Sequence, residues 1–168
     1  KQFHEKGNLK YTFIYVPEGE TFEINEDGEE PVIENIRLIN QYTREAAKIN
    51  ERILVNQFIS GMKDRDDILR QFQKGEIDVI ASMKCLDEGV DIPRAETAIF
   101  CSSTGNPRQF IQRRGRILRR HPEKAYAVIH DLVVIPDYEN EVEGTETYEL
   151  EKSLVRKELE RVMYFAYL

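Results

Sequence analysis

Several features that would indicate a secreted or membrane protein are missing from the sequence. Its 168 residues include only two cysteines, Cys85 and Cys101, which stand in apolar surroundings without a paired spacing. This count excludes a disulfide framework and a zinc site, and it is typical of a reducing compartment. The sequence shows no signal-peptide pattern and no apolar run long enough to span a bilayer. We therefore expect a cytoplasmic protein without a bound metal or a membrane partner.

An overall excess of positive charge is also missing. The chain has 24 Lys and Arg residues against 31 Asp and Glu residues, which gives a formal net charge of -7. A protein that coats nucleic acid or membrane would be basic overall, so any contact with a polyanion must be local. Residues 17–36 hold eight acidic side chains and no lysine or arginine. We interpret residues 17–31 as an acidic, solvated surface insertion.

A phosphate-binding loop is missing as well. No Gly-x-x-x-x-Gly-Lys-Ser/Thr segment occurs, and no strand ends in an Asp-Glu pair that could hold Mg²⁺. The chain alone is therefore expected neither to bind ATP tightly nor to hydrolyse it, and we expect no cofactor in it. Asp87 and Glu88 form such a pair only in a turn, where adjacent side chains point apart, which favours a structural role for them.

The segments that are present alternate between apolar runs and amphipathic stretches. The apolar runs predict five strands, at residues 11–16, 53–59, 77–81, 98–101 and 125–132. Spacings of three and four residues predict a helix from Val32 to Ile49 and another between Asp64 and Gly75, and Asn106-Pro107 predicts the start of a third. Strands that alternate with helices in this way are typical of a parallel sheet. The sequence therefore predicts a three-layer α/β domain over residues 1–136.

The C-terminal part follows a different pattern. An acidic linker is expected at residues 137–147, and a helix is expected at residues 148–168 with an apolar stripe. This helical appendage either packs on its own domain or serves as a stalk or partner helix. The chain begins at Lys1 instead of methionine and ends at Leu168 within the helical pattern. We therefore expect a piece of a larger protein, with the last helix truncated.

The most concentrated charge lies in residues 109–120, where five arginines and one glycine occur within twelve residues. Arginine is always ionised, and its planar fork of donors suits phosphate oxygens. The predicted loops at residues 82–93 and 102–107 follow strands, and such loops form the ligand crevice of parallel α/β sheets. We therefore expect hydroxyls, carboxylates, glycines and arginines to gather at one edge of the sheet.

Two ordered motifs in this region resemble those of a known family. The segment DEGVDIP at 87–93, followed by QRRGRILR at 112–119, resembles motifs V and VI of the superfamily 2 helicases and translocases. The resemblance covers residues 8–136 and implies the second RecA-like lobe, with a central, mainly parallel sheet. Within the superfamily, the chain is most similar to restriction-enzyme subunits and nucleotide-excision-repair helicases that translocate on DNA.

The resemblance implies an ATP site shared between two lobes. ATP with Mg²⁺ would be held mainly by a first RecA-like lobe of the same polypeptide, and Arg116 and Arg119 would act as arginine fingers, which are worth about 10³ to 10⁵ in rate. A helical step of three would put both on the same side. Asp91 would accept a hydrogen bond from a ribose or from a motif VI arginine, or would brace its loop. Arg113 would bond to protein carboxylates across the lobe interface in preference to phosphate. The residues expected near the nucleotide are Gly89, Asp91, Gln112 and Arg113.

The resemblance also implies a track for nucleic acid. Many relatives begin motif V with threonine, but this chain has Met83 there, so the phosphate contact is expected to shift to neighbouring groups. Contacts of this kind carry little sequence information, as a motor requires. DNA is the expected substrate, and RNA is the alternative. The residues expected along the track are Ser60, Gly61, Ser82, Lys84, Thr104 and Arg108.

Two classes of function remain open on the sequence. The first is the second motor lobe of an ATP-dependent helicase or translocase, inactive without its first lobe. The alternative is a non-catalytic α/β module whose arginine-rich helix binds nucleic acid or an acidic protein. An independent phosphate-ester hydrolase is disfavoured because the sequence shows no nucleophile, base or metal constellation. His4, His121 and His130 have no metal-ligand spacing.

Overall fold

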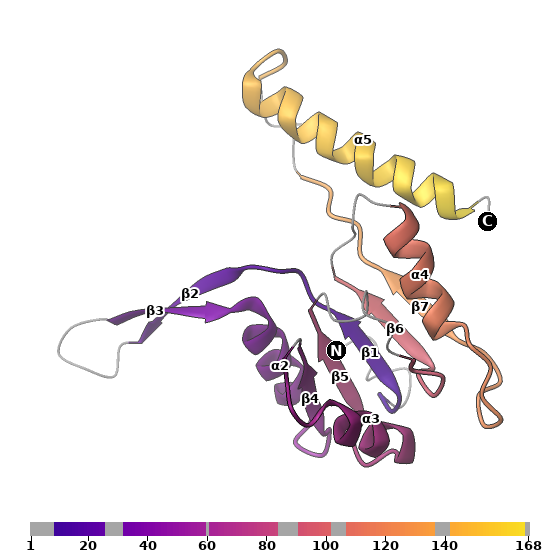
Figure 1. Cartoon of the computed structure of the whole chain (residues 1–168). Coiled ribbons are helices and arrows are strands. Elements are labelled where there is room, and N and C mark those ends of the chain that lie inside the picture. Colours follow the sequence, from indigo (N-terminus) through magenta and orange to yellow (C-terminus); the bar gives the residue numbers. More distant parts are fainter. Residues whose placement is uncertain are drawn as a thin grey trace.

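A five-stranded sheet forms the centre of the computed structural model, which describes residues 9–25, 32–59, 61–83, 91–101, 107–136 and 142–166. The strand order is β4-β5-β1-β6-β7, and every neighbouring pair is parallel (Figure 1). The five strands predicted from the apolar runs are therefore confirmed, and so is the parallel sheet. Their bounds are β1 Thr12–Tyr15, β4 Val55–Phe58, β5 Val79–Ser82, β6 Thr97–Phe100 and β7 Val128–Asp131.

Helices cover both faces of the sheet, as the alternation of side chains along β1 requires. Phe13 and Tyr15 point to the face where α3 (Arg65–Lys74) and α4 (Pro107–Ile117) pack. Ile14 and Val16 point to the opposite face, where they contact α2 (Leu38–Ile49). Successive residues of a strand face opposite sides, so a strand that is apolar on both needs a helix layer on each. This arrangement gives the predicted three-layer α/β architecture.

Glycine sets the end of α3, as the sequence predicted. Gly75 adopts the left-handed conformation, with φ at 74°, and its N–H donates to the carbonyl of Phe72 at 3.0 Å. A residue with a Cβ rarely adopts this conformation, so glycine is favoured here. Asp64 is the N-cap residue, although its side chain makes no capping hydrogen bond; its backbone carbonyl accepts from the N–H of Ile68 at 3.0 Å.

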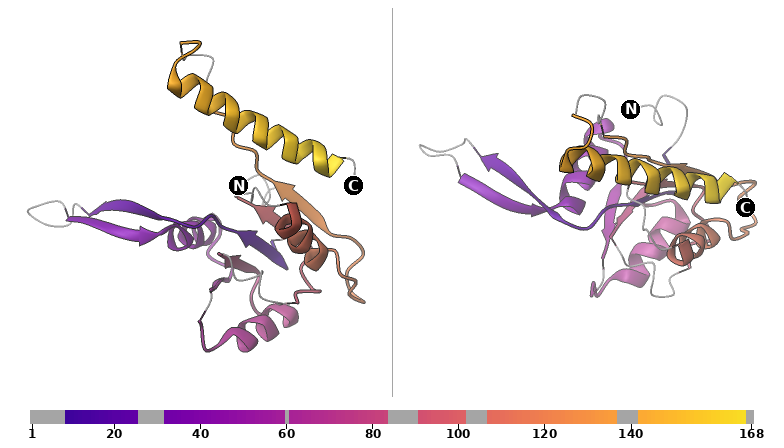
Figure 2. Two further views of the ribbon diagram at one scale, coloured as in Figure 1. Left: turned by 45° about the horizontal axis from the view of Figure 1, so that its top comes forward. Right: turned by 90° about the horizontal axis from the view of Figure 1, so that it is seen from above.

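The prediction for the segment before α2 is wrong in one respect. Residues Glu20–Asn25 (β2) and Val32–Arg37 (β3) form an antiparallel hairpin, and the helix predicted from Val32 begins only at Leu38. Apolar residues four apart fit a helix, but the same positions also fit the two-residue period of a strand, and β-branched residues favour the strand. The N–H of Leu38 donates to the Gly19 carbonyl at 3.0 Å and closes the hairpin at its base. Figures 1 and 2 show the hairpin extending away from the sheet.

The last helix, α5 (Glu146–Ala166), is joined to the domain by charge more than by apolar packing. Arg161 is buried and pairs with Asp131 at the end of β7 and with Glu158 at 2.5 Å. Burial raises the pKa of Asp131 above its ordinary value, and Arg161 opposes that rise. The helix is anchored at this point while much of its apolar surface is exposed, so its role as a stalk or partner helix stays a prediction. The exposed side chains are Leu150, Leu154, Leu159, Val162, Met163 and Tyr164.

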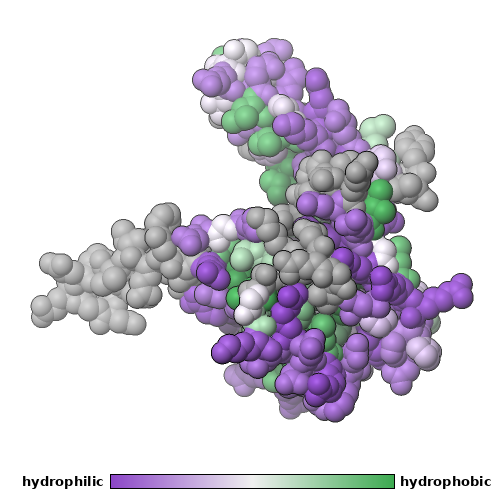
Figure 3. Space-filling model, viewed as in Figure 1, coloured by the Kyte–Doolittle hydropathy of each residue, from purple (hydrophilic) through white to green (hydrophobic). Residues whose placement is uncertain are grey.

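Part of this apolar surface is visible over α5 in the space-filling view, as a green patch among mostly hydrophilic residues (Figure 3). No helix within the described part of the chain has both the length and the apolarity needed to cross a membrane.

Phe110 is one of the buried side chains that fix α4 to the sheet. Its ring is buried and lies 5.1 Å from the ring of Phe100, centroid to centroid. We expect Phe110→Ala to lower the free energy of unfolding by about 3–5 kcal/mol because it leaves a cavity in the core. Tyr126→Ala is the matched control: its ring is 74% exposed, so the change should stay within about 0.5 kcal/mol. Urea unfolding at 25 °C measures both, and equal losses would contradict this placement of the core.

Cys101, which follows β6 directly, offers a chemical test of burial at this edge. Burial raises the pKa of its thiol from 9.0 to about 11. The reactive thiolate at pH 8 is then about 100-fold scarcer than in the unfolded chain, and its share increases tenfold for each pH unit until the pH nears 11. In a Cys85→Ser background, we expect iodoacetamide to alkylate native protein at least about 100-fold more slowly than urea-unfolded protein. Similar rates in the two states would show that the thiol is not buried.

Candidate functional site

The carboxyl ends of the strands carry a stack of two aromatic rings with an arginine against it. Tyr15 and Phe100, the last residues of β1 and β6, are opposite each other in register, and their rings stack 4.3 Å apart at 13°. The guanidinium of Arg113 on α4 lies 5.5 Å from the centre of the Tyr15 ring. A cation over an aromatic face is worth about 0.5–1 kcal/mol at an exposed site. The aromatic pair therefore holds Arg113 at the carboxyl edge, and a contact of Arg113 with carboxylates across a lobe interface stays a prediction.

Arg119 does not lie on the helix, contrary to prediction. The helix α4 ends at Ile117, and Leu118 makes the last helical hydrogen bond, to the Arg114 carbonyl at 2.9 Å. Pro122 disfavours a helical conformation for the residue before it, and the Ile117 carbonyl accepts a hydrogen bond from a lysine side chain instead. The expected helical step of three from Arg116 to Arg119 is therefore wrong.

Asp91 and Arg119 form an ion pair that connects the two sequence motifs. Arg119 Nη1 lies 2.5 Å from Asp91 Oδ2, and the two side chains are 53% and 47% exposed. One of the roles predicted for Asp91 was to accept a hydrogen bond from a motif VI arginine, and this ion pair is a contact of that kind within the lobe. An ion pair this exposed contributes about 0–1 kcal/mol, so it orients the two groups more than it stabilises the fold.

The ion pair and the aromatic stack lie at opposite ends of α4. Arg113 is at the carboxyl edge, whereas the segment after Asp91 leads to the amino end of β6, where the N–H of Glu96 donates to the Tyr11 carbonyl at 2.9 Å. The expectation that the arginines would gather at one edge is therefore only partly right. A helix that returns from the carboxyl end of one strand to the amino end of the next must spread its side chains over the full length of the sheet.

Arg116 lies between these two ends. It is half-buried on α4, and its Nη1 is shielded from solvent without a hydrogen-bond partner in the part of the chain that the structure describes. A buried donor left unpaired costs about 1–3 kcal/mol, and more when it is charged. Arg116 is therefore suited to receive an anionic acceptor from outside the lobe.

Gly115, next to Arg116, faces open space. A Cβ built on this glycine would have no heavy atom within 4 Å, and the residue is exposed in the middle of a helix. A glycine in a helix interior costs about 0.5–1 kcal/mol relative to alanine. Packing within the described lobe does not explain the glycine, so it leaves room for something that approaches from outside.

The other predicted site residues are spread over the sheet. Gln112 is exposed on α4, and Gly61 follows β4 with φ at 81° and open space around it. Ser82, the last residue of β5, is buried opposite Tyr15, and no described group bonds its hydroxyl. The backbone of Arg108 lies in the first turn of α4, and nothing is described of its side chain. Four predicted residues lie outside the described ones, namely Ser60, Lys84, Gly89 and Thr104.

Sequence reasoning overlooked two cations near these residues. Arg65, at the start of α3, places its guanidinium 4.7 Å from the centre of the Phe58 ring, at the carboxyl end of β4 and close to Gly61 in sequence. Lys124 lies in the loop between α4 and β7. Nearness to Gly61 was a usable signal for Arg65, whereas an isolated lysine such as Lys124 carries no sequence pattern.

Comparison with known proteins agrees with this geometry. The model of the family described as helicase conserved C-terminal domain matches residues 32–121. The DNA 3'-5' translocase XPB2 of Sulfurisphaera tokodaii is 36% identical over 97 residues, which are 56% of this chain and 22% of that protein. The putative ATP-dependent RNA helicase MJ1505 of Methanocaldococcus jannaschii is 31% identical over 97 residues, covering 58% of this chain and 11% of that protein. The chain thus spans a fraction of the length of these relatives.

A solved structure supports the fold assignment. The C-terminal domain of the DEAD-box protein Dbp5 superposes with a TM-score of 0.52 at 14% identity, covering 99% of this chain and 76% of that one. At this identity, the likeness shows the fold, which is RecA-like. The family match runs from β3 to the end of the arginine-rich segment and takes in more than half of the chain, including both motifs. This chain therefore belongs to the helicase conserved C-terminal domain family, as a second RecA-like lobe of superfamily 2.

Proposed function

We propose that this chain is the second motor lobe of an ATP-dependent helicase or translocase that acts on DNA. The observation that carries the proposal is the difference between the two motif VI arginines. Arg119 is paired with Asp91, whereas Arg116 has a shielded Nη1 without a partner among the described residues. A γ-phosphate oxygen is the anionic acceptor that such a donor suits. We therefore assign Arg116 as the principal arginine finger. Arg119 is a second cation, which is paired with Asp91 in the isolated lobe.

The rest of the ATP site belongs to the first RecA-like lobe in this proposal. The chain has no P-loop, so ATP and Mg²⁺ would be held mainly by that lobe. Hydrolysis of bound ATP supplies the free energy for lobe movement. From this chain, Gly89, Asp91, Gln112 and Arg113 would face the nucleotide. The Tyr15 ring holds the guanidinium of Arg113, and Gln112 is exposed on the same helix.

Nucleic acid would follow the carboxyl edge of the sheet. Gly61 has open space around it after β4, and Arg65 lies nearby as a cation already held by Phe58. The further contacts proposed are Ser60, Ser82, Lys84, Thr104 and Arg108. We favour DNA because the relative at 36% identity carries the name of a DNA translocase, with RNA as the alternative. Phosphate contacts of this kind would position the strand without reading its sequence.

Arg116→Ala in the intact protein tests the proposal. Loss of a finger that stabilises charge in the transition state should lower the nucleic-acid-stimulated ATPase by about 10³-fold or more. DNA affinity should stay within about twofold, since Arg116 makes no strand contact in the proposal. Arg120→Ala removes an exposed arginine of the same cluster and serves as the control, with activity expected to be nearly unchanged. Wild-type turnover in Arg116→Ala would refute the proposal.

Gly115→Ala separates packing within the lobe from approach by a ligand or by the first lobe. The substitution should raise the free energy of unfolding by about 0.5–1 kcal/mol, because alanine is the better helix residue and the space is open. In the intact motor, the added methyl group should lower the ATPase at least about tenfold by occupying space needed in the closed state. Urea unfolding and steady-state ATPase measure the two effects. A more stable enzyme of unchanged activity would show that Gly115 faces solvent throughout the cycle.

A further inference from the structure

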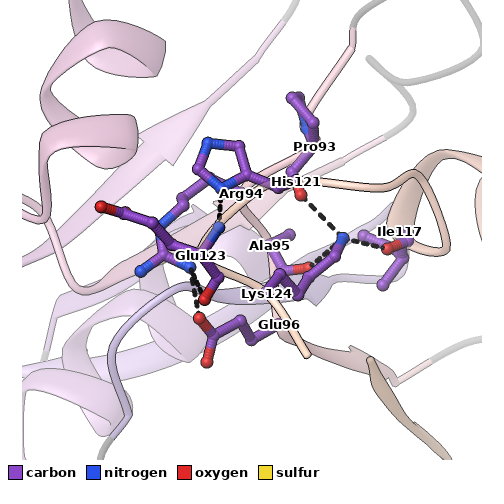
Figure 4. Close-up of polar contacts among 8 residues, drawn as sticks. All are labelled: Pro93, Arg94, Ala95, Glu96, Ile117, His121, Glu123 and Lys124. Atoms are coloured by element: carbon purple, nitrogen blue, oxygen red, sulfur yellow. Dashed lines mark hydrogen bonds and ion pairs between the residues drawn. The ribbon is translucent and has the colours of Figure 1, made fainter. Parts of the chain in front are cut away.

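Lys124 makes three hydrogen bonds to backbone carbonyls from two separate segments. Its Nζ donates to Pro93 at 2.7 Å, to Ala95 at 3.1 Å and to Ile117 at 2.8 Å (Figure 4). An ammonium group has three donors, so these acceptors use all of them. Pro93 and Ala95 lie before β6, and Ile117 is the last residue of α4. The ammonium therefore connects the end of the arginine-rich helix to the segment that enters β6.

The two connected segments carry the Asp91–Arg119 ion pair. Asp91 stands two residues before Pro93, and Arg119 stands two residues after Ile117. Each charged residue lies only two residues from a carbonyl that Lys124 binds. The distance between the two segments therefore decides whether the Asp91 carboxylate and the Arg119 guanidinium can form their ion pair. Desolvation lowers the pKa of Lys124, and the charges of Glu96 and Asp91 oppose that decrease.

A second cation holds the same region from the other side. The guanidinium of Arg94 is nearly buried, lies 3.5 Å from the centre of the Tyr11 ring and pairs with Glu96. Its Nε lies 3.5 Å from a carboxylate oxygen of Glu123, the residue before Lys124 (Figure 4). Arg94 thus secures the loop and the start of β6. Lys124, in turn, reaches the end of α4 through its hydrogen bond to the Ile117 carbonyl.

We propose that Lys124 is a positioning residue for the motor reaction, which acts by fixing the distance between the segments that bear Asp91 and Arg119. The ammonium holds the Ile117 carbonyl at the point where α4 ends, and so it also fixes the last turn, which carries Arg116. A cation at a helix C-terminus gains from the helix dipole, which strengthens this connection. The inference rests on the proposed function, because it assigns Lys124 a role only through the motif VI arginines.

A double-mutant cycle in the intact protein tests this role. Lys124→Met keeps the length of the side chain and removes the ammonium, and Asp91→Asn removes the charge that Arg119 meets. Each change should lower the ATPase kcat about tenfold, and the double variant should be no more than about tenfold down, because both act through one arrangement. A purely structural role predicts a product of about a hundredfold instead. A hundredfold loss would therefore overturn the proposal.

Two further variants keep the result decisive. Ile39→Val destabilises the buried face of α2, on the side of the sheet opposite α4, and should leave kcat unchanged. If Lys124→Met were no less active than Ile39→Val, Lys124 would have no positioning role. If Lys124→Met fails to fold, Lys124→Arg keeps the charge and should fold with a lowered kcat that is again not additive with Asp91→Asn. An active Arg116→Ala would refute the proposed function itself. If Arg116→Ala is inactive but the losses from Lys124→Met and Asp91→Asn multiply in the double variant, only the inference about Lys124 is refuted.

Discussion

The parallel pairing of β1 with both β5 and β6 is the constraint on which the rest of the lobe depends. With β1 in the middle of the sheet and apolar on both faces, each face needs a layer of helices. Parallel neighbours must also be joined by connections that return along the whole strand. The connection from β5 to β6 therefore carries Asp91 toward the amino side of the sheet, and α4 carries Arg119 there from the opposite direction. The ion pair between the two motifs is a consequence of this topology.

The orientation of α4 follows from two buried side chains. Phe110 and Ile117 are seven residues apart, which is about two helical turns, so they lie on one face and both enter the core. Once these two are fixed, the directions of Arg113 and Arg116 are fixed as well. Arg113 reaches the aromatic stack at the carboxyl edge, and Arg116 is left beside the open space at Gly115. Core packing thus sets the positions of the arginines that we propose for nucleotide contact.

What could be predicted from the sequence depended on how local the determining interactions are. Strands such as Thr97–Phe100 are short apolar runs between polar segments, and Gly75 ends a helix by its own backbone freedom, so both were predictable. Val32 and Ile36 satisfy a helical and a strand period equally, and only the pairing of β2 with β3 decides between them. The end of α4 depends in part on Lys124, seven residues beyond Ile117, and a contact of this kind leaves no local pattern.

The candidate site shows the same difference between features set by local sequence and features set by tertiary contacts. Motif spacing singled out Asp91, Arg116 and Arg119, but it could not show that Arg119 is paired with Asp91 or that Nη1 of Arg116 has no partner among the described residues. Arg65 and Lys124 act through groups that are brought to them by the fold, namely the Phe58 ring and three carbonyls. Residues whose role is tertiary become visible only when the tertiary contacts are known.

The cations of this lobe can be ranked by how strongly the lobe itself holds them. The side chains of Arg94 and Arg161 are each 8% exposed and have carboxylate partners, so separating either pair leaves a largely buried charge uncompensated. The Arg119–Asp91 pair is half exposed and contributes about 0–1 kcal/mol, so a phosphate oxygen can replace its carboxylate at little cost. Nη1 of Arg116 has no partner to lose among the described residues. In the proposed motor, burial therefore separates the arginines that maintain the fold from those that remain available to a nucleotide when the lobes close.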